Sequence, residues 1–366
     1  MTPAGAAAGA RPKVRSRKGG AAVPLSDDDK RLMNALQSRF PLDPEPFTAI
    51  ARAIEMPAEE VKARTQRLLD ERIIREITPI FDTRALGYES MLVAAKVDAQ
   101  NPHRAARIIN AHPGVSHNYL RTHEFNLWFT IATPPDSALG LEGTLKVLQE
   151  ETGAESIRQL PTLTLFKINM NLEMEQGTDA LATAVDATPP RELEAQPYDE
   201  TDVAVIRALQ GPMAVVDRPY DAAAVEAGMR TEALLDHLEG MVERKILRRV
   251  AAILYHRRAG FSANGMGVWR VPEDEVLEVG RRMAAVRGIS HCYQRPTYPD
   301  WPYSVFTMAH GRSKDECDAI LDRIAEDHGL HGEDRAVLYS STEFKKVRLH
   351  YFTEDYAAWE REHASV

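Results

Sequence analysis

The chain carries the same eight-residue pattern twice, and this repeat constrains its fold more than any other feature of the sequence. GVSHNYLR occupies residues 114–121 and GISHCYQR occupies residues 288–295, in a chain of 366 residues. Self-similarity of this kind indicates a duplicated structural unit. We therefore expect two halves of similar fold, each holding its own copy of whatever site the pattern builds.

Each copy places a histidine, a tyrosine and an arginine at alternate positions after a turn signal that contains glycine. Alternate residues of a β-strand lie on one face of its sheet. One predicted face is therefore formed in the first copy by Val115, His117, Tyr119 and Arg121, and in the second copy by Ile289, His291, Tyr293 and Arg295. Since buried charge without a partner is rare, these rows predict contact with a polar ligand. Paired polar side chains at an interface between two sheets are the alternative.

The composition is that of a globular protein without membrane-spanning segments. Hydrophobic residues make up 44% of the chain, and no apolar run approaches the roughly 20 residues that cross a bilayer. Residues 1–24 lack the apolar centre of a secretory signal and are predicted to form a disordered tail. Neither Cys292 nor Cys317 belongs to a CxxC pair, which argues against a disulfide framework or a thiolate metal site. We expect a cytoplasmic protein that does not contact membranes.

The charge of the chain is unevenly distributed. The predicted tail has no acidic residue, and its basic residues are Arg11, Lys13, Arg15, Arg17 and Lys18. Since the formal net charge of the whole chain is −9, the remainder is strongly acidic. This acidity argues against a large nucleic-acid surface on the folded part.

Each half begins with three short helical patterns and a strand, which together predict a winged helix-turn-helix domain. In the first half an acidic helix start follows Ser26, and the β-branched run at residues 72–80 is the predicted wing. The second half repeats this order. The predicted domains are residues 25–80 and residues 199–253.

After each wing the pattern becomes β-α-β-β-α-β, which is typical of a small ferredoxin-like sandwich. The predicted sandwiches are residues 81–172, with the last strand at residues 162–168, and residues 254–355. A linker at residues 173–198 joins the halves, and a C-terminal tail follows at residues 356–366. The fold class is thus α+β, a tandem repeat of winged helix-turn-helix and ferredoxin-like domains. Helices cover one face of such a sheet, so we expect the two open faces to meet, within the chain or in a dimer, with the two rows between them.

Four long segments resemble those of one enzyme family with Lrp/AsnC-type architecture, the siroheme decarboxylases. HNYLRTHEFNLWFTI (residues 117–131) and FDTRALGY (residues 81–88) are similar to one subunit of these enzymes. HCYQRPTYPDWPYSVFTMAHG (residues 291–311) and LYHRRAGFSANGMGVW (residues 254–269) are similar to the other subunit. The likeness spans residues 25–352 apart from the linker. The chain therefore resembles a natural fusion of the two subunits, with a NirD-like and a NirL-like half.

This resemblance implies a reaction on a tetrapyrrole. Siroheme decarboxylases remove two acetate carboxyl groups from siroheme as carbon dioxide and give 12,18-didecarboxysiroheme, on the way to heme d1 or to heme by the siroheme-dependent route. The implied partners are siroheme and its decarboxylated product. The resemblance implies no separate cofactor and no metal site, because the iron enters as part of the substrate. A homodimer is compatible with the sequence.

Histidines are the candidate proton donors for this chemistry. Loss of carbon dioxide from a pyrrole acetate leaves carbanion character on a methylene, so a proton must reach the ring or the new methyl group. Histidine titrates near neutral pH and suits this role. The residues selected to donate protons, orient the macrocycle or approach its iron are His117, His291 and His256. Thr83 occupies the place of His256 in the first half, so the halves are not equivalent.

Arginines and aromatic residues are the candidate substrate contacts. A substrate rimmed with carboxylates requires cations, and arginine binds a carboxylate through two parallel hydrogen bonds. The candidates are Arg121, Arg295, Arg257, Arg258 and Arg249, with Arg248 beside the last. A solvent-exposed strand end is the alternative for Arg248 and Arg249. Flat apolar surface for the macrocycle is assigned to Tyr119, Tyr293 and Trp128.

Two other functions share parts of this pattern. A transcription regulator that senses heme or a small metabolite would have the same architecture, but its third helices would enter the major groove and should be basic. Acidic and basic residues are balanced at residues 58–72, and acidic residues are in excess at residues 229–245, so DNA binding is not expected. A heme-binding carrier would share the pocket and would differ only in the absence of turnover.

Overall fold

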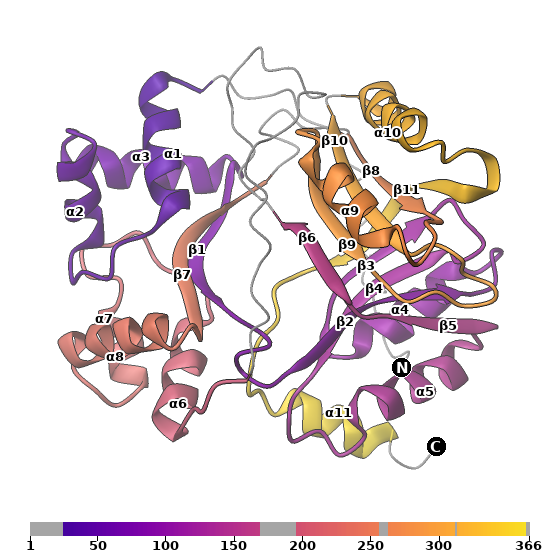
Figure 1. Cartoon of the computed structure of the whole chain (residues 1–366). Coiled ribbons are helices and arrows are strands. Elements are labelled where there is room, and N and C mark those ends of the chain that lie inside the picture. Colours follow the sequence, from indigo (N-terminus) through magenta and orange to yellow (C-terminus); the bar gives the residue numbers. More distant parts are fainter. Residues whose placement is uncertain (1–24, 169–194, 256–262, 312, 364–366) are drawn as a thin grey trace, which may run out of the picture.

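The computed structural model shows two lobes (Figure 1). One lobe contains both helix-turn-helix domains, and the other contains a nine-stranded arrangement with helices on the outside. The predicted basic tail at residues 1–24 and residues 173–194 of the predicted linker lie outside the described part of the chain. No helix among the described residues is both long enough and apolar enough to span a membrane. The structure describes residues 25–168, 195–255, 263–311 and 313–363.

Each helix-turn-helix domain has three helices and a wing strand, as predicted. The elements are α1 (Asp27–Ser38), α2 (Pro46–Ala53), α3 (Ala58–Asp70) and β1 (Ile74–Phe81) in the first domain, and α6 (Glu200–Leu209), α7 (Asp221–Glu226), α8 (Thr231–Glu243) and β7 (Leu247–Leu254) in the second. Strands β1 and β7 pair with each other in an antiparallel sheet. Apolar side chains from both domains form one continuous core, which includes Leu36, Leu68, Leu209 and Leu238. The two domains are therefore a single packed unit.

A buried aspartate in the first helix of each domain binds cations from the region of the third helix. Asp29 is 3% exposed and accepts hydrogen bonds from Arg64 Nη1 at 3.0 Å and from Arg67 Nη2 at 2.5 Å. Asp202 is fully buried and accepts a hydrogen bond from Arg244 Nη2 at 2.6 Å. A helix that reads DNA presents such cations to phosphate groups, whereas these three are bound within their own domains.

We expect Asp29→Asn to lower the free energy of unfolding by about 2 kcal/mol at neutral pH. Burial raises the pKa of Asp29, but hydrogen bonds from Arg67, Arg64 and Ser26 lower it more, to about 2. The carboxylate therefore stabilises the fold fully above a pH of about 4, and this stabilisation is lost as the pH falls toward 2. Denaturant unfolding of both proteins at neutral pH and at a pH of about 3 measures the difference, which should shrink in acid.

Asp27→Asn is the matched control for this prediction. The Asp27 side chain is 98% exposed on the same helix, and its ion pair with Lys30 lies at the surface. Exposed ion pairs contribute little to stability, so this variant should unfold almost like the original protein. Equal losses in the two variants, or a loss for Asp29→Asn that does not depend on pH, would contradict the role assigned to Asp29.

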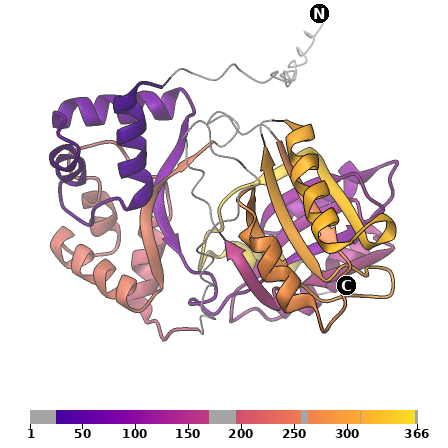
Figure 2. The same cartoon turned by 45° about the horizontal axis from the view of Figure 1, so that its top comes forward.

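The second lobe contains one four-stranded sheet from each half. The first half contributes β2 (Glu89–Lys96), α4 (Pro102–Ala111), β3 (Val115–Arg121), β4 (Leu127–Thr133), α5 (Gly140–Thr152) and β5 (Ser156–Leu160). The second half contributes β8 (Ala263–Trp269), α9 (Val276–Ala285), β9 (Ile289–Gln294), β10 (Val305–Gly311), α10 (Lys314–His328), a 3₁₀ turn (Gly332–Asp334) and β11 (Arg335–Lys346). Figure 2 shows α9 and α10 on the outer side of their strands. Both halves thus have the predicted β-α-β-β-α-β order.

Each half also contributes a strand segment to the sheet of the other half. β6 (Thr164–Ile168) leaves the first half and pairs with β9, and residues 340–346 of β11 leave the second half and pair with β3. The full order is β5-β2-β4-β3-β11-β8-β10-β9-β6. The prediction that residues 162–168 form the last strand of the first sandwich is therefore wrong, because β5 fills that place. β6 alternates like any strand, and only non-local pairing decides which sheet it joins.

The exchanged strands carry equivalent lysines that bind the opposite half. Lys345 on β11 donates from Nζ to the carbonyl oxygens of Asn110 at 2.8 Å and His112 at 3.2 Å, where α4 ends. Lys167 on β6 donates to the carbonyl oxygen of Val286 at 3.1 Å, where α9 ends. Cations stabilise the C-terminal ends of helices, so each half stabilises a helix of the other.

The open faces of the two sheets pack against each other within the chain, as predicted. Their shared core includes Trp128, Leu160, Trp301, Phe306 and Leu338, each 2% exposed or less. The ring centroids of Trp128 and Trp301 are 5.2 Å apart in an edge-to-face arrangement. No second chain is therefore needed to cover either open face.

The C-terminal segment contains a helix and is not the predicted tail. α11 (Asp355–His363) packs Trp359 against His112, with ring centroids 4.5 Å apart. Glu360 accepts two backbone N–H hydrogen bonds just before α5. Tyr356 and Trp359 are buried and lie three residues apart, which is the helical spacing that the prediction missed.

Candidate active site

A β-bulge in β3 decides which side chains of the first row share a face. The register of β3 against β4 shifts between Val115 and His117. Val115 belongs to the core under the helices of its own half. Beyond the shift, Tyr119 pairs with Trp128, which belongs to the core between the sheets. His117, Tyr119 and Arg121 therefore lie on the open face, and Val115 lies on the opposite one.

β9 has the same irregularity at the equivalent place. Its register against β10 shifts between Ile289 and His291, and Ile289 belongs to the core under α9 and α10. A shift of one residue reverses the faces of a strand. The prediction that Val115 and Ile289 share a face with their histidines is therefore wrong, whereas the alternation of histidine, tyrosine and arginine is confirmed.

The residue at each bulge is a serine that contacts the neighbouring histidine. Ser116 Oγ lies 3.0 Å from His117 Nδ1, and Ser290 Oγ lies 2.7 Å from His291 Nδ1. A hydrogen bond at one ring nitrogen fixes the orientation of the imidazole, and in His117 the contact at Nδ1 leaves Nε2 to act on a ligand. These serines were not predicted as site residues from the sequence, although both copies of the repeat contain the dipeptide Ser-His.

His117 is held in its neutral form in the free protein. Burial is the main cause that lowers the pKa of this imidazole to about 4, and the nearby cations Lys346 and Arg75 lower it further. His117 can therefore gain a proton near neutral pH only if a bound anion stabilises the imidazolium.

The arginines of the two rows lie between the sheets. Arg121 donates from Nη1 to the carbonyl oxygen of Leu338 at 3.0 Å, and Arg295 donates to the carbonyl oxygen of Leu160. Arg295 also lies over the ring of Tyr293, 4.8 Å from its centroid. Burial lowers the pKa of each guanidinium to about 10. Each arginine thus binds the opposite half, close to where β11 or β6 passes from one half to the other. Contact of Arg121 and Arg295 with the substrate stays a prediction.

The candidate aromatic contacts differ in exposure. Trp128 is 1% exposed, and its Nε1 donates to the carbonyl oxygen of Phe125 at 2.7 Å. In this structure Trp128 therefore packs the two sheets together. Tyr119 and Tyr293 are partly exposed and follow their histidines on the open face. Substrate contact by these three residues stays a prediction.

The paired arginines of the second wing have different surroundings. Arg248 donates from Nε to Asp82 Oδ2 at 2.7 Å, and its side chain is 55% exposed. Arg249 is partly exposed and lies opposite Ile80 in the wing sheet. The charge of Arg248 is thus compensated by a carboxylate of the protein, and Arg249 remains the better candidate for a substrate carboxylate.

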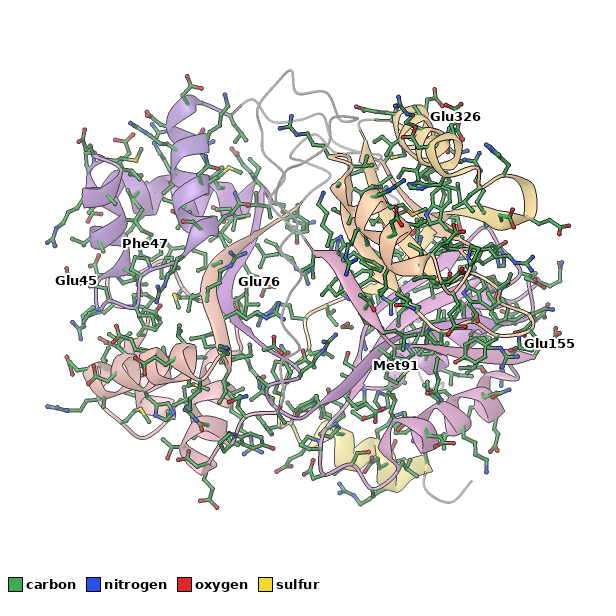
Figure 3. The ribbon with its side chains drawn as sticks, viewed as in Figure 1. Glu45, Phe47, Glu76, Met91, Glu155 and Glu326 are labelled. Carbon is green, nitrogen blue, oxygen red and sulfur yellow. The ribbon has the colours of Figure 1, made fainter. Side chains whose placement is uncertain are left out.

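Charged residues near His117 were not found from the sequence. Arg75 on β1 donates from Nη2 to the carbonyl oxygen of Lys346 at 3.1 Å. Glu76 lies on β1 where this strand faces the second lobe (Figure 3), and its Oε1 is 3.5 Å from Nε of both Arg75 and Arg348. No local pattern marks these residues, because only the tertiary fold brings β1 and the end of β11 to His117.

Three of the predicted site residues, His256, Arg257 and Arg258, lie outside the described residues. Their proposed roles stay predictions. The equivalent loop of the first half is described, and there Thr83 Oγ1 lies 2.9 Å from the hydroxyl group of Tyr351. The C-terminal segment of the chain therefore contacts this loop at the place that corresponds to His256.

Comparison with known proteins decides the family. A model of the AsnC-like ligand binding domain matches residues 85–167 and 258–345, and a model of the siroheme decarboxylase NirDL-like HTH domain matches residues 29–75 and 202–248. A siroheme decarboxylase of Hydrogenobacter thermophilus is 38% identical over 338 residues, which cover 92% of this chain and 99% of that protein. The chain belongs to the siroheme decarboxylase family.

Solved structures of this family support the same two-half architecture. A crystal structure of the siroheme decarboxylase NirDL matches with a TM-score of 0.73 and 35% identity, over 93% of this chain and 99% of that one. A second NirDL structure, in complex with an iron-uroporphyrin III analogue, matches with a TM-score of 0.73 and 34% identity, again over 93% and 99% of the two chains. The predicted fusion of a NirD-like and a NirL-like half in one chain is confirmed.

Proposed function

We propose that this chain is a carboxy-lyase that removes two acetate carboxyl groups from siroheme as carbon dioxide and gives 12,18-didecarboxysiroheme. The observation that carries the proposal is His117, which is oriented by Ser116 and has the cations Arg75 and Lys346 beside it. Such a group can bind carboxylates and transfer a proton. Membership of the siroheme decarboxylase family and the complex of a relative with an iron-uroporphyrin analogue support the class of substrate. The iron belongs to the substrate, and we propose no cofactor of the protein's own.

Substrate binding would prepare His117 for proton transfer. Arg75 and Lys346 would bind carboxylates of the macrocycle through charge-assisted hydrogen bonds. Carboxylates held beside the imidazole stabilise its protonated form, so the pKa of His117 would rise from about 4 in the free protein toward neutral pH in the complex. Protonation would therefore be coupled to the presence of substrate.

The decarboxylation itself breaks the bond between the acetate methylene and its carboxyl carbon. Carbon dioxide leaves, and the electron pair remains on the methylene, where the conjugated ring delocalises it. Protonated His117 would donate from Nε2, since Nδ1 contacts Ser116, and the methylene would become a methyl group. His291 has the same contact with Ser290 and is the candidate for the same role in the second half.

The other predicted contacts divide into two groups. Arg249 and the pair Arg257 and Arg258 are proposed to bind further carboxylates at the rim of the macrocycle. Arg121 and Arg295 are proposed to act mainly by fixing the two sheets, because both donate to carbonyl oxygens of the opposite half. In each row the histidine would then act on the substrate, and the arginine would hold the two sheets together.

Anaerobic incubation of the purified chain with siroheme, followed by mass spectrometry of the extracted tetrapyrrole, tests this function. The expected result is a product that has lost two carboxyl groups as carbon dioxide. Tight binding without a change in mass would contradict the proposal and support a carrier. Location in the cytoplasm and formation of a homodimer stay predictions.

A further inference from the structure

The two histidines have different cross-strand partners. In the pairing of β11 with β3, Lys346 lies opposite His117. In the equivalent pairing of β6 with β9, Ile168 lies opposite His291. Cross-strand partners project from the same face of a sheet, with Cβ atoms about 5 Å apart. One histidine therefore has a cation beside it, and the other has an aliphatic side chain.

Lys346 and Ile168 occupy equivalent positions, as the lysine that precedes each of them shows. Lys345 and Lys167 point to the helix side, where both donate to carbonyl oxygens at a helix end of the opposite half. The strands therefore have the same register and the same orientation in both halves. The difference between Lys346 and Ile168 is a difference in chemistry at one structural position.

Lys346 is available to an external anion. Its side chain is exposed, and within the described part of the chain it forms no ion pair with an acidic side chain. Glu343 lies farther along β11, opposite Tyr119. Arg75 binds the Lys346 carbonyl oxygen and shares the carboxylate of Glu76 with a second arginine. Positive charge is therefore in excess beside His117.

Among the residues that the structure describes, the second half has no cation at the position equivalent to Lys346. Arg248, which corresponds to Arg75, makes its ion pair with Asp82. Ile168 is 45% exposed and offers no charge to a ligand. Arg84 and Arg248 still act electrostatically on Tyr293, but neither lies opposite His291 in the sheet.

We propose that Lys346 binds a carboxylate of the tetrapyrrole beside His117 and thereby makes the His117 half the one that positions the reacting acetate. This inference rests on the proposed function. A lysine ammonium is a compact charge on a flexible stem, which suits an acetate that must approach the imidazole and change during the reaction. An exposed isoleucine cannot hold the same group near His291.

Three variants of the full chain test this role: Lys346→Ile, Lys346→Arg and the double variant Lys346→Ile with Ile168→Lys. Siroheme binding is measured by absorbance titration, and turnover by mass spectrometry. We expect Lys346→Ile to raise both Kd and KM for siroheme at least about tenfold. Lys346→Arg should stay within about threefold of the original protein, because it keeps the charge. The double variant should remain as weak as Lys346→Ile, because the cation is then in the wrong half.

The controls separate this inference from the proposed function and from changes in net charge. Lys146→Ile removes an exposed lysine from α5 and should leave Kd unchanged. An unchanged Kd for Lys346→Ile, or full recovery in the double variant, would overturn the role of Lys346. Binding by the original protein without loss of carbon dioxide would instead refute the decarboxylase, and the same titrations would still measure the contribution of Lys346.

Discussion

Replacement of His117 by alanine is expected to lower kcat for siroheme decarboxylation by about a hundredfold or more, with a change in Kd for siroheme of less than about threefold. The imidazole is the group that we propose to donate a proton to the acetate methylene, and the cations beside it remain in the variant to bind carboxylates. Single-turnover measurements under anaerobic conditions, with mass spectrometry of the tetrapyrrole, give the rate of each loss of carbon dioxide.

The controls for this prediction are other histidines of the chain. His331 is exposed, and His331→Ala should retain the original rate. His291→Ala tests the second half: a variant that removes only one carboxyl group would indicate that the halves share the two reactions. A rate for His117→Ala equal to that of His331→Ala would refute His117 as proton donor.

The pH dependence of the original protein gives a second test of His117. A general acid loses activity as the pH rises through its pKa, and kcat/KM reports the free protein whereas kcat reports the complex. Because the pKa of His117 is about 4 in the free protein, kcat/KM should decline with rising pH across the accessible range. The decline of kcat should occur at higher pH, since bound carboxylates stabilise the imidazolium. The His117→Ala variant should lack both trends.

Local sequence patterns predicted most of the helices and strands, but not α11, β5 or the pairing of the exchanged strands. Helix spacing and capping residues predicted both helix-turn-helix domains, and alternation predicted the strands of both sandwiches except β5. β5 and β6 are both short alternating segments, so nothing local shows that β6 joins the second half. The bulge at Ser116 is also invisible to a rule of strict alternation, and for that reason Val115 was placed on the wrong face.

The candidate site was predictable to the extent that it lies within the repeat. His117 and His291 follow from the repeated pattern, and the structure gives both the same serine contact. Arg75 and Lys346 were missed because β1 and β11 reach His117 from distant parts of the chain. Arg121 and Arg295 lie between the sheets, as predicted for the two rows, and their contact with a ligand stays a prediction.

Gly114→Ala is expected to lower the free energy of unfolding by about 3 kcal/mol, although both residues are small. A Cβ atom on Gly114 would lie 1.9 Å from the carbonyl oxygen of Ala132, which belongs to the backbone of β4. It would also lie 2.9 Å from the ring of His112, whose Nδ1 accepts the Gly114 N–H at 3.0 Å. The first copy of the repeat therefore begins with glycine because β3 and β4 approach each other closely there. Denaturant unfolding measures the loss of stability in the variant.

Gly240→Ala is the control that makes this prediction specific to the close approach. Gly240 lies within α8, and a Cβ atom there meets no atom within 4 Å. Alanine favours helix more than glycine does, so this variant should be as stable as the original protein or up to about 1 kcal/mol more stable. Equal stability of the two variants would show that β4 can move away from Gly114. A large loss for Gly114→Ala alone would show that the backbone contact between β3 and β4 fixes the start of the strand that carries His117.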